Sequence, residues 1–170
     1  MVISTAQGLT LARIGFGLYF IVQAWDKTTR NWLGDGGPLV QFLQRQVPQS
    51  EAFYRPFLEG SVLPNATLFA QLVTIGEWVA GVSLVLGLLT RVGALTGMWL
   101  TLNYMLMKGL PNLSGSVDRL FFLSCLAFLL ASAGLVWGLD GVLGRALGSN
   151  PLTRWLTGAP EARPSPLPAR

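Results

Sequence analysis

Two ionisable residues, Arg13 and Glu77, interrupt long apolar stretches of this 170-residue chain. In a helix that begins at Ala66, Glu77 lies about 16 Å along the axis, near the middle of a hydrocarbon core about 30 Å thick. Its neighbours at helical spacing are small residues, namely Ala70, Thr74, Ala80 and Gly81. In a membrane, such a face packs against another helix, so we expect Glu77 to point into a bundle and to transfer protons or bind a ligand there.

Arg13 is the fixed cation within a predicted span, on a helix face that also carries Gly17 and Phe20. A charge at membrane depth costs at least about 3 kcal/mol unless it is paired, and we therefore expect Arg13 to contact Glu77. Arg13 begins about 8 Å and Glu77 about 18 Å from the same membrane edge, so both side chains must extend toward each other. The pair is either a structural tie between two helices or part of a proton or ligand site, and both alternatives stay open.

Other polar residues could add hydrogen-bonding groups near this pair: Gln23, Gln71, Asn103, Tyr104 and Asp118. Each of them alone suits helix packing or capping equally well. The chain has no His and a single Cys, Cys125. It therefore cannot ligate haem through imidazole, build a four-thiolate iron–sulfur cluster or form the usual zinc sites. We expect no metal or haem on this chain, so any electron transfer must use a diffusible carrier or another subunit.

The elements that must position these side chains are transmembrane helices. Hydrophobic residues make up 51% of the chain and charged residues only 12%, against roughly 25% charged residues in a soluble domain. Four apolar runs approach or reach the roughly 17 to 25 residues that cross a bilayer, namely 8–25, 66–89, 92–107 and 119–138. The sequence predicts an all-α fold, an integral membrane four-helix bundle embedded in the lipid bilayer.

The segments outside the spans have structure of their own. The loop between the first two spans is expected to be partly helical, with an amphipathic helix after Pro38 and an interfacial aromatic stretch from Phe53. After the fourth span, Asp140 is expected to cap a short amphipathic helix. The predicted transmembrane domain covers residues 1–148, and the Pro-rich residues 149–170 are expected to form a flexible tail.

Small residues at helical spacing mark the expected helix contacts. Gly93 and Gly97 form a GxxxG pair in the third span. The fourth span carries a stripe of small residues, namely Ser124, Ala127, Ala131, Gly134 and Gly138. These patterns are expected to hold the bundle together, with a homo-oligomer contact as the alternative.

Short motifs follow one another in a fixed order. They are Leu11-Ala12-Arg13-Ile14-Gly15-Phe16-Gly17, Lys27, Ile75-Gly76-Glu77 with Gly81, Leu86-Gly87-Leu88-Leu89-Thr90-Arg91, and Ala133-Gly134 with Gly138-Leu139-Asp140. This ordered set, within residues 9–148, resembles the DoxX/DoxD family. The aromatic loop leading to Pro64-Asn65 is closer to the DoxD branch, the small membrane subunit of thiosulfate:quinone oxidoreductase. One departure is Trp25-Asp26 before Lys27, where the family often has a His-Gly pair.

The resemblance implies a subunit in the cell membrane of a prokaryote that passes electrons from a sulfur compound such as thiosulfate to the quinone pool, beside a second oxidoreductase subunit. In that reaction Glu77 and Arg13 are the candidate catalytic residues. Tyr104, Asn103 and Lys27 are the candidate quinone-binding residues. Four Arg against one acidic residue after Gly141 favour cytoplasmic termini.

Two other classes of function stay open. In a small-solute or proton transporter component, Glu77 would carry a proton or bind a cationic solute. In a non-catalytic membrane anchor, the bundle would only hold a soluble redox partner at the bilayer. No nucleic-acid partner is expected in any of these cases.

Overall fold

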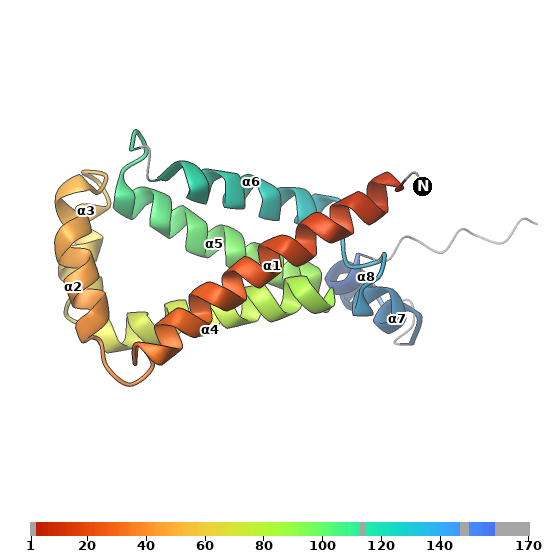
Figure 1. Ribbon diagram of the computed structural model, residues 1–170, viewed down its shortest axis with the longest axis horizontal. Coiled ribbons are helices and arrows are strands. Elements are labelled where there is room, and N and C mark those ends of the chain that lie inside the picture. The colour runs from red at the N-terminus through yellow and green to blue at the C-terminus, as the bar shows by residue number, and fades with distance from the viewer. Residues whose placement is uncertain (1–2, 113–114, 147–149, 159–170) are drawn as a thin grey trace, which may run out of the picture.

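The computed structural model describes residues 3–112, 115–146 and 150–158, and these residues form helices and turns without any strand. The long helices are α1 (Thr5–Thr29), α4 (Ala66–Leu86), α5 (Thr90–Lys108) and α6 (Ser116–Leu130). They lie side by side in one bundle (Figure 1). The prediction of an all-helical fold is confirmed.

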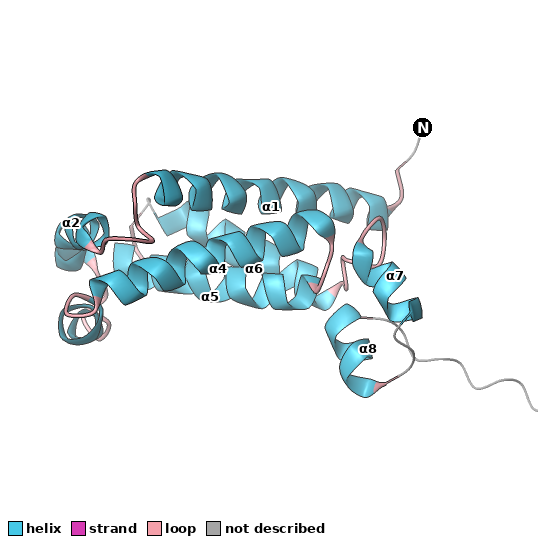
Figure 2. Ribbon diagram, turned by 90° about the horizontal axis from the view of Figure 1, so that it is seen from below, coloured by secondary structure: helices cyan, strands magenta, loops and turns pink. Residues whose placement is uncertain are grey.

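Short helices cover the two ends of this bundle. One end carries the segment between α1 and α4, with α2 (Gly37–Gln46), η1 (Val47–Gln49), α3 (Arg55–Phe57) and η2 (Leu58–Val62). We call this segment the cap; it is the partly helical loop that the sequence predicts. The other end carries α7 (Leu139–Ala146) and α8 (Pro151–Thr157), as Figure 2 shows.

Two helices in the described part of the chain, α1 and α4, are long and apolar enough to cross a membrane. Helix α5 has 19 residues and α6 has 15. At 1.5 Å per residue, α6 is about 22 Å long, shorter than a hydrocarbon core of about 30 Å. The predicted fourth span, 119–138, is therefore wrong in its second half, because α6 ends at Leu130.

The break after α6 has a local cause. Ser132 and Trp137 adopt positive φ angles of 49° and 50°, which a continuing α-helix does not allow. The chain turns there and enters α7, where the expected short helix begins at Leu139. Helix α8 lies within the stretch predicted as a tail, and residues 159–170 of that stretch lie outside the described residues.

Helices α1 and α4 approach each other through two glycines. A Cβ atom at Gly17 would lie 2.8 Å from the backbone nitrogen of Val85, and one at Gly81 would lie 2.9 Å from that of Ile21. Backbone atoms cannot move aside as a flexible side chain can, so both positions require glycine. This contact fixes how α1 lies along α4.

The GxxxG pair of α5 makes two different contacts. A Cβ atom at Gly93 would meet Ser83 of α4, and one at Gly97 would meet the Sγ atom of Cys125 on α6 at 2.8 Å. The pair therefore joins α5 to both of its neighbours, as an interface role predicts.

The small-residue stripe predicted for the fourth span does not form the interface of α6. Ala127 and Ala131 are exposed, whereas Phe121, Cys125 and Phe128 are buried. The rings of Phe121 and Phe128 pack against Phe16 of α1 with centroid distances of 4.6 and 5.7 Å. Aromatic volume, and not close backbone approach, fills this side of the bundle.

At the α7 end, Asp140 caps a helix other than its own. Its carboxylate accepts hydrogen bonds from the backbone nitrogens of Leu89, at 2.7 Å, and Thr90, at 2.9 Å, at the start of α5. The Asp140 nitrogen donates to the carbonyl of Gly87 at 2.8 Å. The expectation that Asp140 caps its own short helix is wrong, because its carboxylate satisfies the free N–H groups of α5 instead.

The α1/α4 contact gives a test with a matched control. Gly81→Val should lower the free energy of unfolding by about 1–3 kcal/mol, because the added side chain must push Ile21 and its backbone away. Gly15→Val places the same side chain on α1 where no atom lies within 4 Å of the new Cβ, and it should stay near the wild type. Thermal unfolding of both variants in detergent measures the difference. Equal losses would show that the approach of α1 to α4 is not limiting.

Candidate functional site

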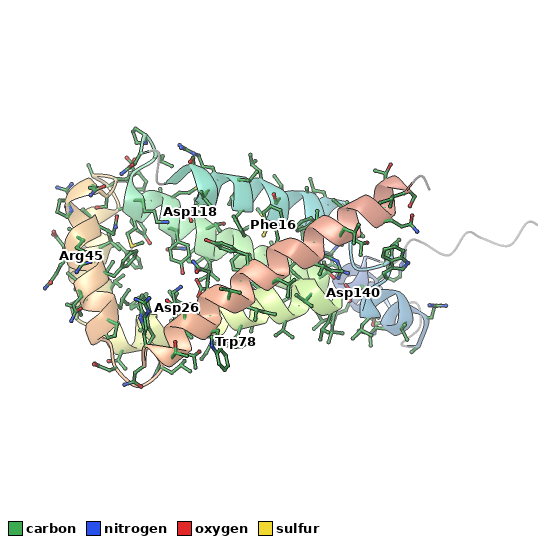
Figure 3. All side chains as sticks on the ribbon, viewed as in Figure 1. Phe16, Asp26, Arg45, Trp78, Asp118 and Asp140 are labelled. Carbon is green, nitrogen blue, oxygen red and sulfur yellow. The ribbon has the colours of Figure 1, made fainter. Side chains whose placement is uncertain are left out.

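A cavity of about 770 Å³ lies at the cap end of the bundle, with walls from α1, α4, α5, α6 and the cap. In Figure 1 the α1/α4 pair and the α5/α6 pair separate toward this end. Asp26 near the end of α1 and Asp118 at the start of α6 both line the cavity, whereas Asp140 lies at the opposite end of the bundle (Figure 3). The cavity is the place where charged side chains from all the long helices meet.

Glu77 is the most deeply buried carboxyl group of this cavity, with 1% of its surface exposed. Its Oε1 atom accepts hydrogen bonds from Lys27 Nζ at 2.8 Å and from the Tyr104 hydroxyl at 2.6 Å. Its Oε2 atom has no hydrogen-bond partner among the described residues. Two other helices, α1 and α5, thus each donate a hydrogen bond to the same carboxyl oxygen, and the other oxygen accepts none from the described residues.

A second ion pair lies on the other side of Tyr104. Lys108 Nζ, at the end of α5, and Asp118 Oδ2, in the first turn of α6, are 2.7 Å apart. The ammonium groups of Lys27 and Lys108 lie 5.9 and 5.6 Å from the centroid of the Tyr104 ring. Cation–π attraction at such distances helps to fix the ring, so Tyr104 links the two charged pairs.

Consecutive residues of α1 and α4 position the Glu77 side chain. Lys27 contacts Glu77, and the hydroxyl of the next residue, Thr28, accepts a hydrogen bond from Trp78 Nε1 at 3.1 Å. The rings of Trp25 and Trp78 also pack edge to face with centroids 6.4 Å apart. These contacts of residues 25, 27 and 28 with residues 77 and 78 together fix the register of α1 against α4 around the carboxyl group.

The cap is bonded to the wall of the cavity through Tyr54, which sequence reasoning did not single out. The Tyr54 hydroxyl donates to Asn103 Oδ1 at 2.5 Å, and Asn103 Nδ2 donates to the carbonyl of Trp99 at 2.7 Å. Burial raises the pKa of Tyr54 to about 12, so the phenol stays protonated and remains a donor. The aromatic stretch from Phe53 was the available signal in the sequence.

The structure brings together four of the five predicted site residues. Glu77, Lys27, Tyr104 and Asn103 all line the cavity.

Arg13 does not contact Glu77, and the expected pairing is wrong. The Arg13 guanidinium is fully buried beside Gly87, near the charge of Asp140. Gly87 lies ten residues beyond Glu77, which is about 15 Å along a helix. Lys27, in the last turn of α1, reaches the carboxylate instead.

In the described part of the chain, no group of three or more His, Cys, Asp or Glu side chains comes together as a metal site would require. The ionisable groups of the cavity are instead ammonium, guanidinium, carboxyl and phenol groups, and several of them form hydrogen-bonded pairs. Such an arrangement can donate hydrogen bonds to a ligand and can exchange protons with it.

The described fold is a helical bundle with a partnered carboxyl group inside it, and two of its helices are long and apolar enough to cross a membrane. A family model for DoxX matches residues 8–109, which is more than half of the chain, and the chain belongs to the DoxX family. The matched segment contains Arg13, Lys27, Glu77 and Tyr104, whereas Asp118 and Asp140 lie beyond it. No solved structure matches the chain.

The Lys27–Glu77 pair gives a stability test. Lys27→Met removes one partner of a buried pair and should lower the free energy of unfolding by about 3–5 kcal/mol. The double change Lys27→Met with Glu77→Gln should recover a large part of this loss, because no unpaired charge remains.

The pair Asp26–Arg30 serves as the matched control, since both of its side chains are more than half exposed. The corresponding change Arg30→Met should alter the unfolding free energy by about 1 kcal/mol or less. Urea or thermal unfolding in detergent measures all the variants. Additive losses for Lys27→Met and Glu77→Gln would contradict a coupled pair.

Proposed function

We propose that this chain is a multi-pass protein of a prokaryotic cell membrane whose cavity binds a quinone headgroup. In this proposal it is the membrane subunit of a quinone-linked oxidoreductase, and a second subunit supplies electrons from a reduced sulfur compound such as thiosulfate. The observation that carries the proposal is the free Oε2 atom of a buried carboxyl group, Glu77, in the wall of a ligand-sized cavity.

The dimensions and chemistry of the cavity suit such a headgroup. A volume of about 770 Å³ falls within the range of roughly 300–1,000 Å³ that is usual for small-molecule sites. Aromatic rings such as Trp32, Phe42 and Phe69 supply flat apolar walls. Lys27 and Lys108, whose ammonium groups each carry three N–H donors, supply donors that suit carbonyl oxygens.

The residues of the cavity would supply the protons of the reaction. Reduction of a quinone to a quinol takes up two electrons and two protons, and the electrons come from the sulfur donor through the second subunit. Glu77 would hold one proton at Oε2, and Lys27 and Tyr104 would stabilise the carboxylate once that proton has left. Lys108 and Asp118 would connect this cluster to the end of the bundle. Arg13 lies outside the cavity and has no part in this proposal.

All the long helices would lie in the bilayer, with the short α6 extended at its end by interfacial residues such as Trp137. Both termini would then lie in the cytoplasm and the cap outside.

Cysteine labelling in intact cells tests this orientation. The wild-type chain has only the buried Cys125 as background. Gln44→Cys in the cap should react with a membrane-impermeant maleimide, and Ala146→Cys in α7 should react only after the cells are opened. Both positions are exposed. The reverse pattern would invert the topology, and labelling of both in intact cells would contradict an even number of spans.

Glu77→Gln tests the proposed chemistry, because glutamine keeps the shape and the hydrogen bonds but cannot ionise. In membranes that contain the partner subunit, quinone reduction with thiosulfate should fall by about 10²-fold or more, the usual share of a proton-transferring group. Assembly of the complex should remain intact.

Glu59→Gln is the matched control, since it makes the same chemical change at an exposed carboxylate of the cap. It should leave the rate unchanged. Normal turnover by an assembled Glu77→Gln complex would remove this residue from the reaction. Failure of wild-type membranes to reduce quinone with any sulfur donor would reject the oxidoreductase proposal.

A further inference from the structure

The cavity is not enclosed on all sides, and its wall includes side chains that also lie on the outer surface of the bundle. Leu72 of α4 is 55% exposed and Trp99 of α5 is 66% exposed, yet both line the cavity. Two more residues that line the cavity lie one helical turn from these: Gly76 follows Leu72 on α4, and Thr96 precedes Trp99 on α5. We call this outer opening, formed by Leu72, Gly76, Thr96 and Trp99, the α4–α5 groove.

Gly76 faces Leu100 of α5. A Cβ atom at this position would lie 3.4 Å from both methyl carbons of Leu100, which is ordinary contact, and no closer atom opposes it. The glycine therefore answers no demand for close backbone packing, unlike Gly17 and Gly81.

The opposite side of the cavity, between α1 and α6, is filled by rings. Tyr19 of α1 lies 4.3 Å from Phe121 of α6 between centroids, and Phe20 lies 5.6 Å from the same ring. At the cap end, the Tyr54–Asn103 hydrogen bond closes the groove. The α4–α5 groove is the side of the cavity where two lining residues, Leu72 and Trp99, reach the apolar outer surface of α4 and α5.

The surface that surrounds the groove is apolar along both helices. The exposed large side chains beside it include Leu68, Ile75 and Val79 on α4 and Leu95 on α5. Helix α4 is one of the two helices apolar enough to cross a membrane. In a bilayer these side chains face hydrocarbon, so the groove opens into the lipid and not into water.

We infer that the α4–α5 groove holds the hydrocarbon tail of a lipid-borne ligand whose polar headgroup occupies the cavity. This inference rests on the proposed quinone site and adds its substrate class: a quinone with a long apolar tail that arrives from the bilayer. A water-soluble ring compound would make the headgroup contacts but would leave the groove to lipid.

The test compares two probes on the purified full chain in phosphatidylcholine nanodiscs, with binding followed by quenching of tryptophan fluorescence. One probe is a benzoquinone with a ten-carbon tail, and the other is the same ring without a tail. Their concentrations are expressed as the amount dissolved in the lipid. For the wild type, the tailed probe should bind more tightly than the ring alone, because the tail is buried against the groove.

Gly76→Phe fills the groove and should weaken binding of the tailed probe by about tenfold, or 1.4 kcal/mol. Binding of the ring without a tail should change by less than about threefold, because its site lies in the cavity. One control should leave both affinities unchanged. Gly15→Phe adds the same ring on α1, outside the cavity wall, where no atom lies within 4 Å.

A second variant blocks the groove after folding. Leu72→Cys can be modified with a bulky maleimide on the folded protein, while the buried Cys125 of the unmodified wild type serves as the background. Val79→Cys, exposed on α4 but outside the cavity wall, is the matched control. Modification at position 72 should weaken the tailed probe by about tenfold, and modification at 79 should not.

The outcomes separate the two proposals. If wild type binds both probes and neither blocked variant changes the tailed probe, the groove holds only bilayer lipid and the inference is overturned while the quinone site stands. Equal weakening of both probes also overturns it, because the change then acts on the headgroup site. If wild type binds neither probe, the proposed quinone function fails and the inference fails with it.

Discussion

A carboxylate buried among apolar helices must be given partners, and this requirement organises the cap end of the bundle. Water cannot solvate Glu77, so a cation and a hydroxyl must reach it from other helices. Lys27 of α1 and Tyr104 of α5 do so. Each donor can reach Glu77 only if its helix lies at a fixed position along α4. The packing of α1 against α4 and the spacing between α4 and α5 therefore both depend on Glu77. The Gly17–Gly81 approach meets the first of these demands.

The buried charges at the two ends of the bundle have different surroundings. At the α7 end, Arg13 and Asp140 lie in tightly filled surroundings where glycines 87, 134 and 138 leave no space for a side chain. At the cap end, the charged pairs line an open volume. Filled polar clusters stabilise a single arrangement of the backbone, whereas an open one can change partners when a ligand arrives. The two sets of charges look alike along the sequence, and only their surroundings in the fold tell them apart.

Much of the fold follows from periodicity in the sequence, and what does not follow has a physical reason. The inward direction of Glu77 was predictable because Thr74, Ala80 and Gly81 are small residues at helical spacing around it. Its partner was not, because the choice between Arg13 and Lys27 depends on how two antiparallel helices are aligned, and single-helix periodicity carries no information on that alignment. The end of α6 at Leu130 was missed because the following residues are as apolar as those before. Hydropathy measures transfer into lipid and not the backbone angles of Ser132.

The cap that Asp140 forms on α5 joins residues 50 positions apart in the chain. Proteins are made from the N-terminus at about 5–20 residues per second, so the first turn of α5 waits roughly 3–10 s for this carboxylate to emerge from the ribosome. During that interval the backbone N–H groups of Leu89 and Thr90 have no acceptor from α7. During biosynthesis the hairpin of α4 and α5 therefore lacks the Asp140 cap until translation has passed α6. In a chain truncated before residue 140, the start of α5 would lack this cap permanently. The uncapped start of α5 is then a local structural difference between incomplete and finished copies of the protein.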